Sequence, residues 1–298
     1  MRKAGSTRWY WNRLRAYIGR PRMIVQTKPV LIDDHAYCEN PVFIVGPHRS
    51  GTSLVRRLFN SHPDIACPPE SFFIPDYAAM LADEHVLSGY AGFGYSAEDA
   101  RRDLARKASS LHEAYRLATG KRIWADKTPR YSLQMGAIDR LYGGKARFVL
   151  VLRHPGDVVY SIFKRDWRFT DHADGFESAL DHVRNCIAAM LDFEAHHPAR
   201  SVRIDYAMLC ETPEAELGEA LGKLGLAFDP AMLDFAEQDH NFGLEDPVVR
   251  GTRVIQPQSG SWLARFAAFC PVTCPFDLWP ERLNKPCLLR CAQCSPRT

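Results

Sequence analysis

Short runs of apolar, β-branched residues alternate along the chain with longer segments whose apolar residues recur at helical spacing. The runs Pro41–Gly46 and Arg147–Leu152 are the most strand-like, and a shorter one covers residues 201–204; buried parallel strands have this continuous apolar character. Leu54, Leu58 and Phe59 give segment 52–61 the apolar face of a helix. Further helices are predicted at about 71–82, 97–119, 130–142, from Pro155 onward, 175–197 and 213–224. This alternation predicts one α/β domain with helices on both faces of a parallel sheet.

Composition narrows the class of protein. The 298 residues are 46% hydrophobic and 24% charged, with a formal net charge of +3, values that exclude wholesale disorder and do not favour nucleic-acid binding. The sequence contains no run of about 18 apolar residues, so no membrane-spanning helix is predicted. The basic N-terminus, residues 1–22, lacks the apolar core of a signal peptide. We therefore expect a cytoplasmic protein, whose basic lead-in (residues 1–40) either packs on the domain or lies on a membrane surface.

The segment between the first predicted strand and the next helix has the features of an anion-binding loop. It reads Gly46-Pro-His-Arg-Ser-Gly-Thr-Ser53, and the spacing of Gly46 and Gly51 is that of the nucleotide phosphate loop. Thr52 occupies the position where that loop carries its lysine. Arg49 and the hydroxyls of Ser50, Thr52 and Ser53 are instead available to one tetrahedral anion. The simpler interpretation is a strand–helix turn with a capping hydroxyl.

The longer segment PVFIVGPHRSGTSLVRRLFNSHPDIACPPE, residues 41–70, resembles the 5′-phosphosulfate motif of sulfotransferases that use 3′-phosphoadenosine 5′-phosphosulfate (PAPS). It is most similar to the branch that contains the tyrosylprotein sulfotransferases and their bacterial relatives. The resemblance covers about residues 41 to 265 and implies a P-loop NTPase-like, three-layer α/β/α fold. It implies that Arg49, Ser50, Gly51, Thr52 and Ser53 bind the phosphosulfate of PAPS, which acts as co-substrate without a metal.

Two later segments match further motifs of this family. Arg153, at the end of a predicted strand, and Ser161, about two helical turns on, match its 3′-phosphate motif, and Arg165 lies one turn beyond Ser161 on the same face. Arginine suits phosphate because its guanidinium donates in a forked geometry. Tyr206 matches a tyrosine that lies against the nucleotide, although Ala207 departs from the acidic residue usual there. Taken alone, Arg153 and Ser161 are more typical of a surface arginine and a solvated helical serine. Tyr206 is equally typical of a packing tyrosine.

The resemblance also implies the catalytic residues. Sulfuryl transfer needs a base for the acceptor hydroxyl and positive charge near the bridging oxygen of the leaving nucleotide. Glu70 matches the catalytic carboxylate and is predicted to be the general base with a raised pKa, whereas by itself it reads as a cap of the predicted helix Ser71–Leu81. Lys127, in Asp126-Lys-Thr-Pro129, and Arg49 are predicted to stabilise the leaving group, with Asp126 orienting the lysine. The histidines at positions 48 and 62 are second choices for the base.

The last part of the chain predicts less. Segment 250–262 matches a stretch that covers the nucleotide in the family, with Thr252 or Ser259 as possible contacts. We place the sulfotransferase domain at 41–268 and a divergent Cys/Pro-rich tail at 269–298, where Cys270, Cys274, Cys287, Cys291 and Cys294 fit no familiar zinc module.

Several questions stay open at this point. Small molecules, glycans, lipids and peptides all remain candidate acceptors, and a homodimer is compatible with the sequence. Two rival functions are a Mg²⁺-dependent kinase, which the missing loop lysine disfavours, and a nucleotide-binding module without catalysis.

Overall fold

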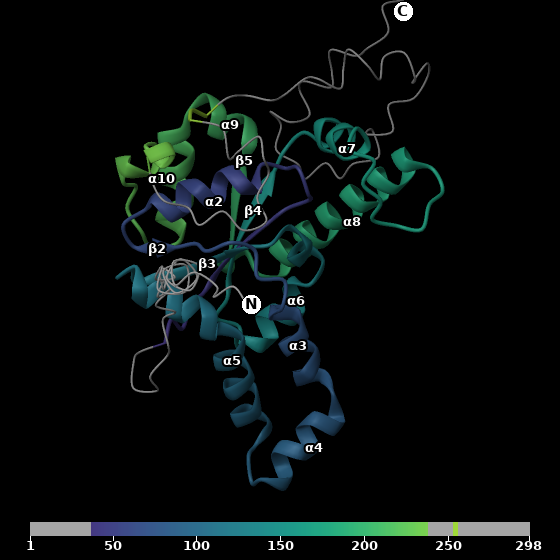
Figure 1. Ribbon diagram of the computed structural model, residues 1–298, viewed down its shortest axis with the longest axis vertical. Helices are drawn as coiled ribbons and strands as arrows, with labels where there is room; N and C mark the ends of the chain where they lie inside the picture. The colour runs from purple at the N-terminus through teal and green to yellow at the C-terminus, as the bar shows by residue number, and fades with distance from the viewer. Residues whose placement is uncertain (1–36, 238–252, 256–298) are drawn as a thin grey trace, which may run out of the picture. The chain divides into compact units, whose positions relative to one another are not determined.

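Five parallel strands form the centre of the protein (Figure 1). The computed structural model describes residues 37–237 and 253–255, which belong to one compact unit. The order of the strands across the sheet is β2-β3-β1-β4-β5, with bounds β1 Val42–Val45, β2 Ile65–Ala66, β3 Ile123–Lys127, β4 Arg147–Leu152 and β5 Ser201–Asp205. Central strand β1 pairs with β3 on one side, Phe43 opposite Asp126, and with β4 on the other, Val45 opposite Leu150.

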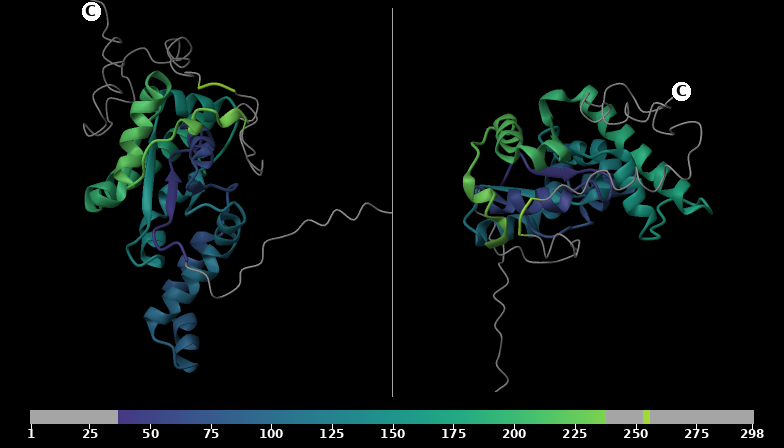
Figure 2. Two further views of the ribbon diagram at one scale, coloured as in Figure 1. Left: turned by 90° about the vertical axis from the view of Figure 1, so that its left-hand side faces the viewer. Right: turned by 90° about the horizontal axis from the view of Figure 1, so that it is seen from above.

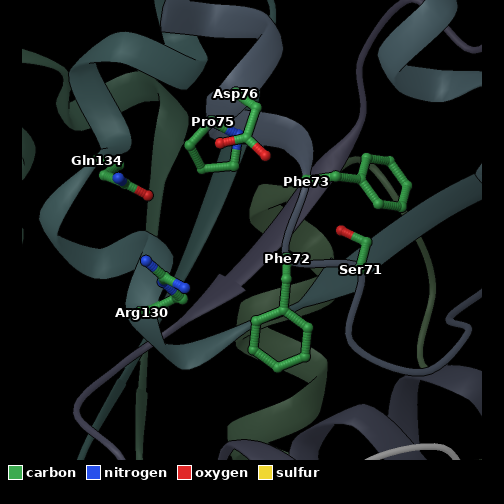
Figure 3. Close-up of a pocket in the computed structure, with 7 residues that line it drawn as sticks. All are labelled: Ser71, Phe72, Phe73, Pro75, Asp76, Arg130 and Gln134. Carbon is green, nitrogen blue, oxygen red and sulfur yellow. The ribbon is translucent and has the colours of Figure 1, made fainter.

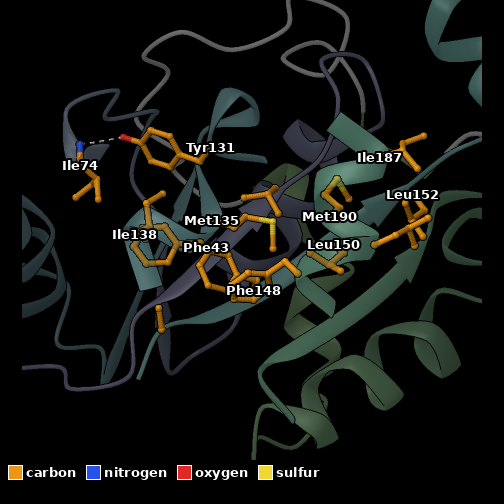
Figure 4. Packing of buried hydrophobic residues seen from close by; sticks show 14 of the residues in the cluster. Phe43, Ile74, Tyr131, Met135, Ile138, Phe148, Leu150, Leu152, Ile187 and Met190 are labelled. Carbon is orange, nitrogen blue, oxygen red and sulfur yellow. Dashed lines mark hydrogen bonds between the residues drawn. The ribbon is translucent and has the colours of Figure 1, made fainter. Parts of the chain in front are cut away.

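The two faces of the sheet bury different residues because side chains alternate along a strand. Phe43, Val45, Phe148 and Leu150 belong to one apolar cluster, part of which Figure 4 shows. Their neighbours in sequence point into the cluster on the opposite face, which contains Val42, Ile44, Val149, Val151, Val202 and Ile204. Burial on both faces explains why β1 and β4 are continuously apolar.

Helices cover both faces, as Figures 1 and 2 show. The first cluster is covered by α3 (Ile74–Ala82), α5 (Ala97–Ala118), α6 (Met135–Leu141), α7 (Pro155–Phe163) and α8 (Gly175–His196). The second cluster packs against α2 (Thr52–Ser61), α9 (Tyr206–Glu211) and α10 (Pro213–Lys223). The predicted three-layer α/β/α fold with a central parallel sheet is confirmed.

Several element boundaries differ from the predictions. The helix predicted at 71–82 begins only at Ile74, so Glu70 lies in a loop and does not cap it. Helix α4 (Glu84–Gly92) was not predicted, and the segment predicted as one helix at 130–142 divides into the 3₁₀ turn η1 (Pro129–Leu133) and α6. Three further 3₁₀ turns, η2, η3 and η4, cover Pro198–Arg200, Pro230–Met232 and Phe235–Glu237.

Strand β3 was also missed, because its last two residues are the charged pair Asp126 and Lys127, which are nevertheless buried. A strand that ends in two charged residues does not have the continuous apolar pattern by which β1 and β4 were recognised.

Some predictions fall outside the described residues. These are the basic lead-in up to residue 36, Thr252 and Ser259 of the covering segment, and the cysteine-rich tail. Among the helices that the structure describes, none combines the length and apolarity needed to cross a bilayer.

Candidate active site

The predicted site residues follow the carboxyl ends of four adjacent strands. The loop 46–51 follows β1, Lys127 ends β3, Arg153 follows β4 and Tyr206 follows β5. Parallel strands bring these ends to one edge of the sheet, and the chain changes direction across the sheet at β1, which is where ligands bind in open α/β sheets. The fold therefore gathers groups that are up to about 160 residues apart in sequence.

The loop after β1 forms an open anion site at the start of helix α2. The amide of Ser50 donates to the Pro47 carbonyl at 3.1 Å, and Arg49 and Gly51 have left-handed φ angles of 75° and 103°. Among the described residues no side chain caps α2 at Gly51, and the first turn of this helix has no acidic residue. The amides of this turn and the helix dipole thus remain available to an anion.

Gly51 also allows the ring of Tyr206 to approach the loop. A Cβ atom at this position would lie 2.3 Å from Cδ2 of Tyr206, which is 5% exposed. The guanidinium of Arg153 lies 4.9 Å from the centre of the Tyr206 ring on its face and donates to the main-chain carbonyl of Arg49 at 3.1 Å. Burial lowers the pKa of Arg153, although Asp157 opposes the shift.

Ser161 joins the two predicted anion sites. Its hydroxyl accepts hydrogen bonds from Nε of Arg49 and from Nη1 of Arg165, both at 3.1 Å. Arg49 comes from the loop after β1, whereas Ser161 and Arg165 come from α7 and the residues just after it. The structure therefore brings Arg49, Arg153, Ser161, Arg165 and Tyr206 together, as the sequence predicted.

The hydroxyls of the loop differ in their surroundings. Ser50 is buried, and its Oγ has no hydrogen-bond partner among the described residues. Thr52 is buried as the first residue of α2, while Ser53 receives a hydrogen bond of 3.4 Å from Nζ of Lys127. A buried hydroxyl without a partner is costly, so an anion that accepts from Ser50 would remove this cost.

Glu70 and Lys127 form an ion pair at the edge of the site. Their side chains are 13% and 1% exposed. Burial raises the pKa of Glu70 even though Lys127 lowers it. A carboxylate whose pKa is raised in this way is better suited to accept a proton.

The structure corrects the role predicted for Asp126. Neighbouring residues of a strand point to opposite faces, and among the described residues no hydrogen bond or ion pair joins the Asp126 carboxylate to Lys127. Its buried carboxylate accepts hydrogen bonds from Ser71, from Nε2 of His112 at 2.8 Å and from the Thr128 hydroxyl at 2.7 Å. Asp126 thus holds the loop that carries Glu70, because Ser71 is the next residue.

A second residue that sequence analysis missed also holds this loop. Arg56, which is 1% exposed on α2, donates from Nε to the carbonyl of Pro68 at 3.0 Å. No signal in the sequence indicated this role, because Arg56 lies on the polar side of the predicted helix, away from Leu54 and Leu58. Ser71 and His112 gave no signal either, because the contacts that they make with Asp126 link three separate segments.

The two histidines considered as bases have other partners. His62 bonds through Nε2 to the carbonyl of Ala227 at 2.9 Å and is structural. His48 lies 3.1 Å from His182 of α8, measured between Nδ1 and Nε2, and stacks on Phe169 with ring centres 4.5 Å apart. Burial lowers the pKa of His48 to about 3.

Comparison with known proteins decides the family. The profile of the sulfotransferase family matches residues 41–230, more than half of the chain. The chain belongs to the sulfotransferase family. This match begins at the predicted domain boundary, and the predicted boundary at residue 268 stays a prediction. Within the described residues, no group of three or more His, Cys, Asp or Glu side chains is arranged to hold a metal ion.

Two individual relatives show how far the similarity extends. The chain is 28% identical over 222 residues to the nodulation protein NoeE of Sinorhizobium fredii, covering 65% of this chain and 51% of that protein. It is 24% identical over 213 residues to a putative protein-tyrosine sulfotransferase of Caenorhabditis briggsae, covering 67% and 70%. The chain thus spans about half the length of NoeE and a larger part of the nematode protein.

A solved structure supports the fold of this sulfotransferase-family chain. The sulfotransferase domain of the Synechococcus PCC 7002 olefin synthase superposes with a TM-score of 0.59 at 20% identity, covering 90% of this chain and 99% of that domain.

Proposed function

We propose that the protein transfers a sulfuryl group from PAPS to an acceptor hydroxyl. The observation that carries this proposal is the set of hydrogen bonds that links the two anion sites. The Ser161 hydroxyl accepts from both Arg49 of the loop and Arg165, and Arg153 donates to the loop backbone. PAPS has a phosphosulfate at one end and a 3′-phosphate at the other, so it needs two such sites at a fixed separation. A triphosphate does not need the second site.

The residues of the two sites suit the two ends of PAPS. The start of α2, with Ser50, Thr52 and Ser53, would hold the phosphosulfate, because backbone amides and hydroxyls donate to its oxygens. Arg153, Ser161 and Arg165 would hold the 3′-phosphate, and Tyr206 would lie against the nucleotide. The buried Ser50 hydroxyl and the close approach of Tyr206 to Gly51 support this assignment.

Glu70 and Lys127 would perform the chemistry. Glu70 takes the proton of the acceptor hydroxyl while the acceptor oxygen forms a bond to sulfur and the bond from sulfur to the bridging phosphate oxygen breaks. The leaving oxygen gains negative charge, which Lys127 and Arg49 stabilise. In the present structure Lys127 is paired with Glu70. We infer that the lysine transfers its hydrogen bond to the nucleotide when PAPS binds, which frees Glu70 to act as base.

A Mg²⁺-dependent kinase would use a lysine of its own phosphate loop. Here the ammonium group beside Ser53 comes instead from Lys127 of β3, which is already paired with Glu70. This difference disfavours the kinase. The metal independence, the cytoplasmic location and a homodimer remain predictions.

Calorimetry and a transfer assay test the proposal together. We expect adenosine 3′,5′-bisphosphate, the product nucleotide, to bind, and Arg153→Ala to abolish that binding. With labelled PAPS and a panel of phenols, sugars, lipids and peptides, we expect label transfer by the wild type and its loss in Glu70→Gln, which keeps nucleotide binding. Tighter binding of ATP than of the bisphosphate, with Mg²⁺ present, would favour the kinase. Unchanged transfer by Glu70→Gln would refute its role as base.

A further inference from the structure

A cavity of about 280 Å³ opens beside the segments that carry Glu70 and Lys127 (Figure 3). One wall begins at Ser71, directly after Glu70, and another contains Arg130, three residues after Lys127. The two walls are fastened to each other, because the amide of Ser71 donates to the Thr128 hydroxyl at 3.3 Å. The cavity is therefore built from the same two segments that hold the proposed base and the lysine.

One polar side chain that lines this cavity lacks a partner within the described part of the chain, and two others are exposed. The side-chain oxygen of Gln134 is buried and accepts no hydrogen bond there. Asp76 and Arg130, which line the same cavity, are exposed and form no ion pair with described residues. Buried acceptors are normally satisfied, so the Gln134 oxygen indicates a ligand that donates a hydrogen bond.

Phe72 supplies an apolar surface to the cavity at the cost of backbone strain. Its φ angle is 63°, a left-handed conformation that is rare for a bulky residue. Such strain gathers at ligand sites, where the surrounding structure maintains it. Phe73 beside it is anchored differently, since it packs against the main core and lies edge-on to His112 with ring centres 6.0 Å apart.

We infer that this cavity binds the acceptor and that the acceptor group is a sugar unit rather than a phenol, an inference that rests on the proposed function. A volume near the lower limit for ligand pockets suits one ring. A phenol would present only its reacting hydroxyl and would leave the buried Gln134 oxygen without a donor. A sugar has hydroxyls that donate to Asp76 and Gln134 and accept from Arg130, and a C–H face that packs on Phe72.

The test compares two acceptor classes in matched variants. Labelled PAPS is supplied with a set of methyl glycosides, and separately with p-cresol and a tyrosine-containing peptide. We expect label transfer to at least one glycoside. Gln134→Leu and Arg130→Met should each lower its kcat/KM at least tenfold, while the affinity for adenosine 3′,5′-bisphosphate stays unchanged. Arg140→Met, an exposed arginine of α6, is the control and should leave both quantities unchanged.

Direct binding provides a second readout that does not depend on turnover. Saturation-transfer NMR with the bisphosphate present should detect the glycoside, and Gln134→Leu should weaken that signal. Transfer to phenols alone, absence of glycoside binding, or variants that behave like Arg140→Met would overturn the inference. In each of these outcomes bisphosphate binding would leave the proposed function standing, whereas failure to bind the bisphosphate would remove both.

Discussion

The contact between Gly51 and Tyr206 predicts a large effect for the smallest possible substitution, Gly51→Ala. The added Cβ would lie 2.3 and 2.7 Å from two carbon atoms of the Tyr206 ring, where carbon atoms normally stay 3.5–4.0 Å apart. Overpacking of this kind costs about 1–3 kcal/mol. The φ angle of 103° adds about 1–2 kcal/mol for a residue with a Cβ. We expect Gly51→Ala to lower the free energy of unfolding by about 2–5 kcal/mol.

Urea denaturation measures this loss, and a double-mutant cycle with Tyr206→Ala separates its two parts. Removing the ring abolishes the overlap but not the backbone strain, so Gly51→Ala should cost about 1–3 kcal/mol less in the Tyr206→Ala background. Gly89→Ala is the control, because nothing lies within 4 Å of its added Cβ on helix α4; it should stabilise the protein by about 0.5–1 kcal/mol. Equal costs of Gly51→Ala in both backgrounds would refute the steric reasoning.

Four further predictions follow from the site. Glu70→Gln should lower kcat at least about 100-fold, which an assay of label transfer would measure. Its affinity for adenosine 3′,5′-bisphosphate, measured by calorimetry, should stay unchanged. Because burial raises the pKa of Glu70, kcat/KM should fall on acidification with a midpoint above the ordinary value for glutamate, and a midpoint at or below that value would contradict the assignment. Asp126→Asn should lower the free energy of unfolding by about 3 kcal/mol, since it weakens the hydrogen bonds of three donors to a buried carboxylate. It should also lower kcat more than it lowers nucleotide affinity, and Gly89→Ala again serves as control. Burial lowers the pKa of His48 to about 3 and that of His182 to about 4, below the unfolded value of about 6.5. The unfolded chain therefore binds more protons below about pH 6.5, and the folding stability that these neutral histidines permit is complete only above about that pH. As the pH falls, the free energy of unfolding should decline by up to about 1.4 kcal/mol per pH unit for each histidine. His48→Gln should show a shallower decline in urea titrations between pH 6.5 and 5, and an equal slope would count against a neutral His48.

The sequence predicted the parts of the fold that depend on local pattern. Strands β1 and β4 and helices α2, α5 and α8 could be recognised because each has a continuous apolar run or a helical apolar face. Strand β3 could not, since its buried Asp126 and Lys127 depend on partners from other segments, such as His112 and Glu70.

The site followed the same rule. The motifs located Arg49, Arg153 and Ser161, and the fold brought them together as expected. The partners of Asp126 could not be anticipated, because Ser71 and His112 reach it from a loop and from the far end of α5. The start of α3 was placed three residues too early, because the apolar residues Phe72 and Phe73 directly before it belong to a loop, with Phe72 in a left-handed conformation.

The origin of Lys127 on a neighbouring strand couples ligand binding to the assembly of the sheet. A loop that contains its own lysine can hold phosphate as soon as its strand and helix have formed. Here the ammonium reaches Ser53 only after β3 has paired with β1, so an excised strand–loop–helix fragment would lack the charge. Nucleotide should therefore bind only the fully formed sheet, and at 100 times its dissociation constant it would stabilise that state by about 2.7 kcal/mol. The melting temperature of the whole domain thus becomes a direct measure of nucleotide affinity.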